Sequence, residues 1–190
     1  EENNAMGSSR IFESVPHLVG KPIIEGGLVN SGLSSYFTYY IQCETSQNCA
    51  GYPTLVNPVG FDLTAATAHL ELFNVKHFIA RWPELRNAMR KSSDWRLAHT
   101  SGAWQLFELV THEGAYVTIP SHWPRALTTD HWKARALDWI YTTNALQQLF
   151  VFLPANAKTI DPVFSTPLDE SQFRQYLAQQ RTRTGDIDEW

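Results

Sequence analysis

The sequence predicts a mixed α/β (α+β) fold in which a single mixed β-sheet is covered by helices. Strand-like segments alternate with segments of helical spacing, and one β-hairpin around residues 95–110 interrupts that alternation. The chain has 190 residues, of which 43% are hydrophobic and 18% charged, so it can bury a real core. We therefore predict one soluble mixed α/β domain over residues 1–181, followed by a loose C-terminal tail at 182–190.

The N-terminal part is predicted to begin with two short strands. Residues 10–15 (RIFESV) form the first, which Pro16 ends, and residues 22–25 (PIIE) form the second. Residues 33–42 are rich in β-forming aromatic side chains, yet a serine at their start is able to cap a helix. A helix and an aromatic strand therefore both remain open for that segment.

A capped helix, a strand and a second helix are predicted next. Asp62 is a typical N-cap, Asn74 suits a helix C-terminus, and apolar residues recur between them at helical spacing. Residues 75–80 (VKHFIA) favour a strand, and Pro83 is typical of the first turn of a helix.

The second half of the chain begins with the predicted hairpin. Residues 95–99 and 103–110 alternate in polarity around the turn Thr100-Ser101-Gly102. The remaining expected elements are a strand at 115–120, a helix beginning at Thr129 or Asp130, a fully buried strand at 149–153, and a helix that starts at Thr166-Pro167-Leu168-Asp169 and ends near Arg181.

Two cysteines, Cys43 and Cys49, lie in the polar stretch CETSQNC. Such a pair closes a disulfide, remains as two free thiols, or contributes to a metal site. A zinc site needs two more ligands, and the seven histidines show no paired spacing, so we expect no metal. We favour the disulfide, which would contribute roughly 2 kcal/mol by loop entropy and place the domain outside the cytosol.

A glycine-rich stretch, GGLVNSGLSS at 26–35, is close in spacing to a phosphate-binding loop. Leu33 stands where such a loop needs its lysine, so we expect a tight turn and no nucleotide. The net charge of −4 also argues against a surface that follows nucleic-acid phosphates. No cofactor is predicted.

The segment 10–36 has the densest mixture of polar side chains and glycines that helical or strand periodicity does not explain. Glu13 and Glu25 end the two predicted strands, so they could converge as a general acid and base, or remain exposed strand-end charges. Further ligand-binding candidates in this segment are Arg10, His17, Lys21, Asn30 and Tyr36. The seven tryptophans and seven tyrosines are either core residues or a platform for sugar rings.

Two stretches carry a family resemblance: NNAMGSSRIFESVPHLVGKPIIEGGLVNSGLSSYFTYYIQCE, and HLELFNVKHFIARWPELRNAM followed by DWRLAHTSGAWQLFEL. Their phrases are R-x-F-E-S-x-P, G-x-x-x-x-E-G-G and L-F-N-V-K-x-F-I-A. Together, over residues 3–153, they resemble large bacterial and archaeal polytopic membrane proteins related to GT-C glycosyltransferases. Some of these are labelled "6-pyruvoyl-tetrahydropterin synthase-related" membrane proteins.

The resemblance implies an extracytoplasmic domain, at the periplasmic or outer face, of a longer membrane-anchored chain. Its implied partners are the membrane-embedded part of the same chain and a glycan or lipid-linked sugar. GT-C enzymes place their catalytic carboxylate between membrane helices, and Asp138-Trp139-Ile140-Tyr141 departs from the W-W-D-Y-G motif of oligosaccharyltransferases, so no catalytic role is transferred.

Two functions follow from these observations. In the first, the domain is a non-catalytic accessory that binds or positions a glycan, or packs on the membrane-embedded core. In the alternative, it is a glycoside-directed hydrolase or transferase that uses Glu13 and Glu25. The absence of a complete catalytic motif favours the first.

Overall fold

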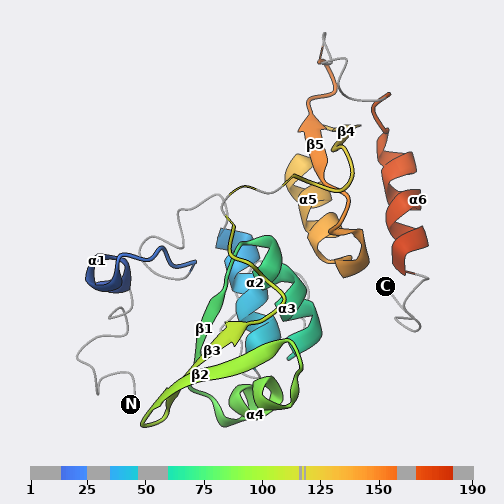
Figure 1. Cartoon of the computed structure of the whole chain (residues 1–190). Helices are drawn as coiled ribbons and strands as arrows, with labels where there is room; N and C mark the ends of the chain where they lie inside the picture. Colours follow the sequence, from blue (N-terminus) through green and yellow to red (C-terminus); the bar gives the residue numbers. More distant parts are fainter. Residues whose placement is uncertain are drawn as a thin grey trace. The chain divides into compact units, whose positions relative to one another are not determined.

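In the computed structural model the chain divides into two compact units, Glu1–Gly114 and Ala115–Trp190, and each is described by itself (Figure 1). This division into units does not decide whether residues 1–181 form one domain. The predicted single domain stays a prediction. Ser35 and Tyr36 are described by their backbone alone. The described residues are 14–24, 35–46, 60–115, 117, 119–157 and 166–181.

The N-terminal unit combines helices with an antiparallel sheet whose strand order is β1-β3-β2. Gly102, with φ of 56°, makes the turn between β2 and β3, where a left-handed backbone favours glycine. Its elements are α1 (Val15–Val19), α2 (Ser35–Thr45), α3 (Leu63–Leu72), β1 (His77–Ala80), α4 (Pro83–Lys91), β2 (Trp95–Ser101) and β3 (Trp104–Leu109).

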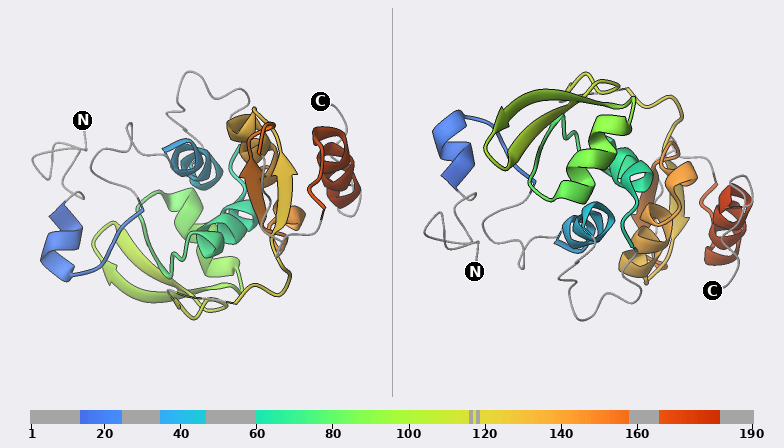
Figure 2. Two further views of the ribbon diagram at one scale, coloured as in Figure 1. Left: turned by 90° about the horizontal axis from the view of Figure 1, so that it is seen from above. Right: turned by 90° about the horizontal axis from the view of Figure 1, so that it is seen from below.

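Helices α2, α3 and α4 cover one face of this sheet, as the two views of Figure 2 show. The alternation of β3 directs Phe107 and Leu109 to that face, where they are fully buried. Leu70 of α3 and Met89 of α4 pack in the same hydrophobic cluster. The core of the unit therefore forms where the helices meet the sheet.

The C-terminal unit contains two parallel strands that lie between α5 and α6 (Figure 2). Leu127 pairs with Phe152, and Leu168 extends the pairing as an isolated bridge to Leu127. Phe173 of α6 is fully buried in the cluster around Leu127. The elements are β4 (Arg125–Thr128), α5 (Trp132–Ile140), the 3₁₀ turn η4 (Thr143–Ala145), β5 (Phe150–Leu153) and α6 (Glu170–Arg181).

The structure confirms the mixed α+β class and the hairpin around 95–110. The side chain of Asp62 accepts hydrogen bonds from the backbone N–H groups of Thr64 and Ala65, so it caps α3 as predicted. Of the two possibilities for residues 33–42, the described part is helical. Phe37 and Tyr40 contact the rings of Phe73 and His69, at the end of α3 and within it, with ring centroids 5.9 and 5.6 Å apart. This tertiary packing outweighs the β preference of the aromatic residues.

The predicted single mixed sheet is wrong, because the described strands form two separate sheets. The parallel pair β4–β5 has its own hydrophobic core and shares no ladder with β1–β3. The strand expected at 10–15 is also wrong at its last residue, because Val15 is the first residue of α1. Residues 22–24 have no regular structure.

The strand expected at 115–120 is not seen at the described residues 115, 117, 119 and 120, which have no regular structure, and β4 follows a few residues later. Val117 and Ile119 are 86% and 94% exposed, so the apolar alternation there is not used to bury a strand face. Residues of β5, predicted to be fully buried, are each half-buried. The tail at 182–190 lies outside the described residues.

Candidate functional site

The structure describes the side chains of two candidate residues in the polar segment 10–36. His17 lies in the last turn of α1 and Lys21 follows that helix, and both side chains are exposed. The predicted convergence of the segment on one surface stays a prediction. The candidates Arg10, Glu13, Glu25, Asn30 and the side chain of Tyr36 lie outside the described residues.

Cys43 lies in α2 and is fully buried, whereas Cys49 lies outside the described residues. The described part of the chain contains no free thiol. Because Cys49 is not among the described residues, the Cys43–Cys49 disulfide stays a prediction. Within the same residues, no three His, Cys, Asp or Glu side chains are grouped so that they could hold a metal ion.

One open pocket of about 280 Å³ lies in the C-terminal unit, and we call it the α6 pocket. Most of its lining comes from α6, at positions i, i+3, i+4 and i+7, which a helix places on one face. The lining residues are Arg125, Leu168, Gln172, Gln175, Tyr176 and Gln179.

Local hydrogen bonds determine where α6 begins. Asp169 and Gln172 form a reciprocal capping box, in which each backbone N–H donates to the other side chain at 3.0 and 2.8 Å. Leu168 donates its N–H to Ala126 and accepts from Thr128, at 2.8 and 3.0 Å. These bonds attach the start of α6 to β4 and so place the glutamines beside Arg125.

Aromatic contacts position the ring of Tyr176 in the α6 pocket. The ring packs edge-on against Phe150 at 5.6 Å, and Phe150 packs against buried Phe173 at 5.1 Å. The Arg125 guanidinium lies 5.9 Å from the Tyr176 ring centroid. The pocket thus combines exposed carboxamides with a fixed aromatic ring and a cation.

The sequence analysis missed this site. Its signal is the spacing Q-x-x-Q-Y-x-x-Q in Gln172–Gln179, a polar stripe opposite the apolar positions Phe173 and Leu177. A stripe of this kind is ordinary for a surface helix. The stripe becomes a pocket only because Arg125, which is distant in sequence, lies beside it together with Leu168, which lies just before α6.

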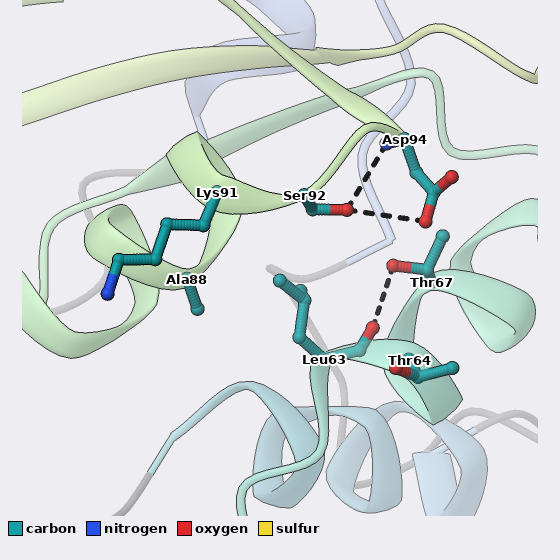
Figure 3. A pocket seen from close by; sticks show the side chains of 7 residues that line it. All are labelled: Leu63, Thr64, Thr67, Ala88, Lys91, Ser92 and Asp94. Atoms are coloured by element: carbon teal, nitrogen blue, oxygen red, sulfur yellow. Dashed lines mark hydrogen bonds between the residues drawn. The ribbon is translucent and has the colours of Figure 1, made fainter.

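A second pocket, of about 300 Å³, lies between α3 and the C-terminal end of α4, and we call it the α3–α4 pocket (Figure 3). The Thr67 hydroxyl donates to the Leu63 carbonyl at 2.7 Å and accepts from the Trp95 indole N–H at 2.9 Å. The lining residues are Leu63, Thr64, Thr67, Ala88, Lys91, Ser92 and Asp94.

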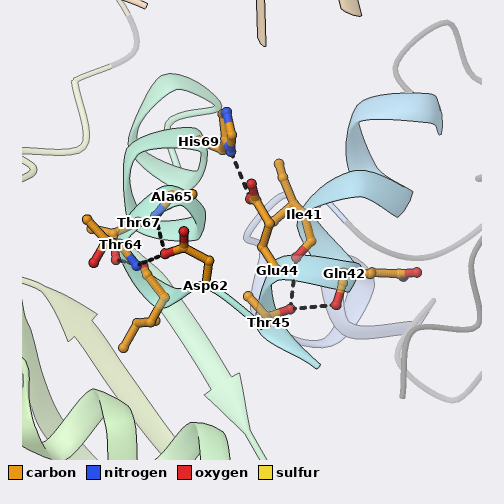
Figure 4. Close-up of polar contacts among 10 residues, drawn as sticks. Ile41, Gln42, Glu44, Thr45, Asp62, Thr64, Ala65, Thr67 and His69 are labelled. Carbon is orange, nitrogen blue, oxygen red and sulfur yellow. Dashed lines mark hydrogen bonds and ion pairs between the residues drawn. The ribbon is translucent and has the colours of Figure 1, made fainter. Parts of the chain in front are cut away.

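A buried acid–base pair joins α2 to α3. His69 Nδ1 and Glu44 Oε2 lie 2.8 Å apart, with side chains 0% and 1% exposed (Figure 4). Burial raises the pKa of Glu44, hydrogen bonding and charge interaction with His69 oppose that shift, and the charge of Asp62 adds to it. Since both side chains are buried, a substrate cannot reach them. The pair instead links the two helices.

Among the described residues, no helix is long and apolar enough to cross a membrane. Comparison with known proteins finds no matching family model, no matching curated protein and no matching solved structure.

Proposed function

We propose that this chain is an extracytoplasmic accessory domain of a membrane-anchored, glycosyltransferase-like protein, and that it binds or positions a glycan through the α6 pocket. The observation that carries the glycan part is the row of carboxamides beside an aromatic ring in that pocket. The extracytoplasmic location and the attachment to a membrane are inferred from the sequence resemblance. Packing on the membrane-embedded part of the same chain belongs to the same proposal.

The side chains of the α6 pocket match the hydrogen-bonding chemistry of a sugar. A sugar hydroxyl both donates and accepts, and a carboxamide offers an acceptor oxygen and two N–H donors. Gln175 and Gln179 are exposed and lie one turn apart on α6. The Gln172 oxygen already accepts from Asp169, so this residue contributes its NH₂ group.

The pocket also supplies an apolar surface for the C–H face of a sugar ring. Tyr176 is half-buried and packs against Phe150, and the buried Leu168 lines the same pocket. Aromatic rings suit such contacts because they add apolar area with few rotatable bonds to immobilise. The glutamines, by contrast, lose rotamer freedom on binding. We therefore expect weak affinity, about millimolar, equivalent to about −4 kcal/mol.

The catalytic alternative depends on Glu13 and Glu25, which lie outside the described residues. No described contact favours it. The buried Glu44–His69 pair has suitable groups for acid–base chemistry, but no access for a substrate. Accessory binding is therefore the proposal that the described residues support best.

The test is a titration of the protein with the neutral disaccharides maltose and lactose, followed by backbone amide chemical shifts in NMR. We expect saturable shifts at residues 172–179 and at Arg125. A variant carrying Gln175→Ala and Gln179→Ala should lose them, whereas Gln180→Ala should keep them. Gln180 is a matched control because it has the same side chain, lies on α6 and does not line the pocket. Unchanged binding by the double variant, or no shift with any sugar, would refute the proposal.

A further inference from the structure

We propose that the α3–α4 pocket is a binding site for a small zwitterion, whose ammonium group contacts Asp94 and whose anionic group faces Lys91. This site is separate from the α6 pocket and does not depend on the glycan proposal. The argument starts from Asp94, a half-buried carboxylate in the pocket wall.

Asp94 has no basic partner among the described residues. Its Oδ2 accepts from the Ser92 hydroxyl at 3.3 Å, and its backbone N–H donates to the same hydroxyl at 3.2 Å. Every other buried or half-buried carboxylate in the described part of the chain contacts a basic side chain. These pairs are Glu44 with His69, Glu108 with Arg96, Asp138 with Arg135, and Glu170 with Arg174.

The surroundings of Asp94 favour an ammonium group as the missing partner. An ammonium has three N–H donors, and the pocket offers acceptor oxygens from Asp94, Ser92 and Thr64. The carbonyls at the C-terminal end of α4 lie at the same pocket, and Ser92 caps two of them. The negative end of a helix dipole favours a cation there. The opposing N-terminus of α3 is already neutralised by Asp62.

The rest of the lining limits the size and charge of the ligand. Leu63 and Ala88 provide apolar walls for a short carbon chain. Lys91 starts on the opposite side of the pocket from Asp94, and in Figure 3 its ammonium end points away from the pocket. Because this side chain is exposed and has a flexible four-carbon stem, it can turn toward the anionic group of a bound ligand. It forms no ion pair with a described residue. A volume of about 300 Å³ is at the lower end for ligand pockets, which fits a molecule the size of an amino acid.

Three probes separate the contributions of the two charges: β-alanine carries both, ethanolamine carries only the ammonium, and propionate carries only the carboxylate. Amide chemical shifts of Thr64, Ser92 and Asp94 report binding. We expect β-alanine to bind most tightly, ethanolamine more weakly, and propionate not at all at the same concentrations. Equal binding of propionate and β-alanine would overturn the proposal, as would no shift with either amine at tens of millimolar.

Two variants test the named contacts. Asp94→Asn keeps the size and the hydrogen bond with Ser92, and we expect it to weaken both amines by at least about tenfold, equivalent to about 1.4 kcal/mol. Lys91→Met should lower the affinity for β-alanine to that for ethanolamine and leave ethanolamine unchanged. Glu71→Gln is the matched control, because Glu71 is an exposed carboxylate on α3 that does not line the pocket. Binding that survives Asp94→Asn refutes the site.

Discussion

Replacing His69 with phenylalanine should strongly destabilise the N-terminal unit, because it leaves the buried Glu44 carboxyl without its partner. One carboxyl oxygen, Oε2, lies 2.8 Å from His69 Nδ1, and the other, Oε1, has no hydrogen-bond partner among the described residues. Phenylalanine keeps an aromatic ring for the edge contact with Tyr40, at 5.6 Å between ring centroids. The substitution therefore removes the ring nitrogens and preserves most of the packing.

Removing one partner of a buried charged pair costs about 3–5 kcal/mol, whereas replacing both by apolar groups is often neutral. Glu44 can escape part of this cost by taking up a proton, since burial already raises its pKa. We therefore expect His69→Phe to lower the free energy of unfolding by about 3 kcal/mol at neutral pH. The double variant Glu44→Met/His69→Phe should recover most of that loss.

The loss should also depend on pH. A carboxyl whose pKa is raised by folding stabilises the folded state most fully below its unfolded pKa, and that contribution disappears as pH rises through the folded pKa. Without His69 the pKa of Glu44 rises further. The difference between wild type and His69→Phe should therefore shrink as the solution is acidified from neutral pH towards the ordinary glutamate range.

Urea unfolding, followed by circular dichroism at neutral and at acidic pH, measures these free energies. Hydrogen exchange of α2 and α3 amides shows whether the loss is local to the two helices. His99→Phe, the same change at an exposed strand position, is the matched control and should stay within about 0.5 kcal/mol. The reasoning is refuted if His69→Phe is no less stable than the double variant, or if its loss is the same at both pH values.

Three further predictions concern the disulfide, the second core and the glycine-rich stretch. Protein purified without reductant should show no reactive thiol in denaturant and two after reduction, and two thiols before reduction would contradict the Cys43–Cys49 bond. Phe173→Ala should lower the free energy of unfolding of the C-terminal unit by about 3–5 kcal/mol, because it empties a fully buried site, whereas exposed Arg174→Ala should change it by less than about 1. ATP and GTP at millimolar concentration should leave the melting temperature unchanged, since Leu33 cannot neutralise phosphate. A nucleotide present at 1,000 times its Kd would increase the free energy of unfolding by roughly 4 kcal/mol. A clear shift of the melting temperature would therefore contradict the prediction that residues 26–35 form a turn.

The amino-acid sequence alone determined the elements whose signals are local. Asp62 and Pro83 mark helix starts because a cap and a proline satisfy or remove backbone N–H groups within one turn. Gly102 marks the hairpin because its backbone takes a left-handed conformation. The capping box at Asp169 places the start of α6 in the same way. Each of these features involves residues only a few positions apart.

Tertiary structure decided the pairing of strands and the position of every candidate pocket. The apolar pattern of 149–153 predicts a buried strand equally well in one large sheet and in a two-stranded pair. Its partner β4 is too short to give a recognisable strand pattern in the sequence. Glu44 and His69 are 25 residues apart, so neither residue signals the other. The stripe of glutamines on α6 becomes a pocket only beside Arg125. Such contacts depend on how whole elements bury their apolar faces, which is a property of the packed chain and not of any short segment.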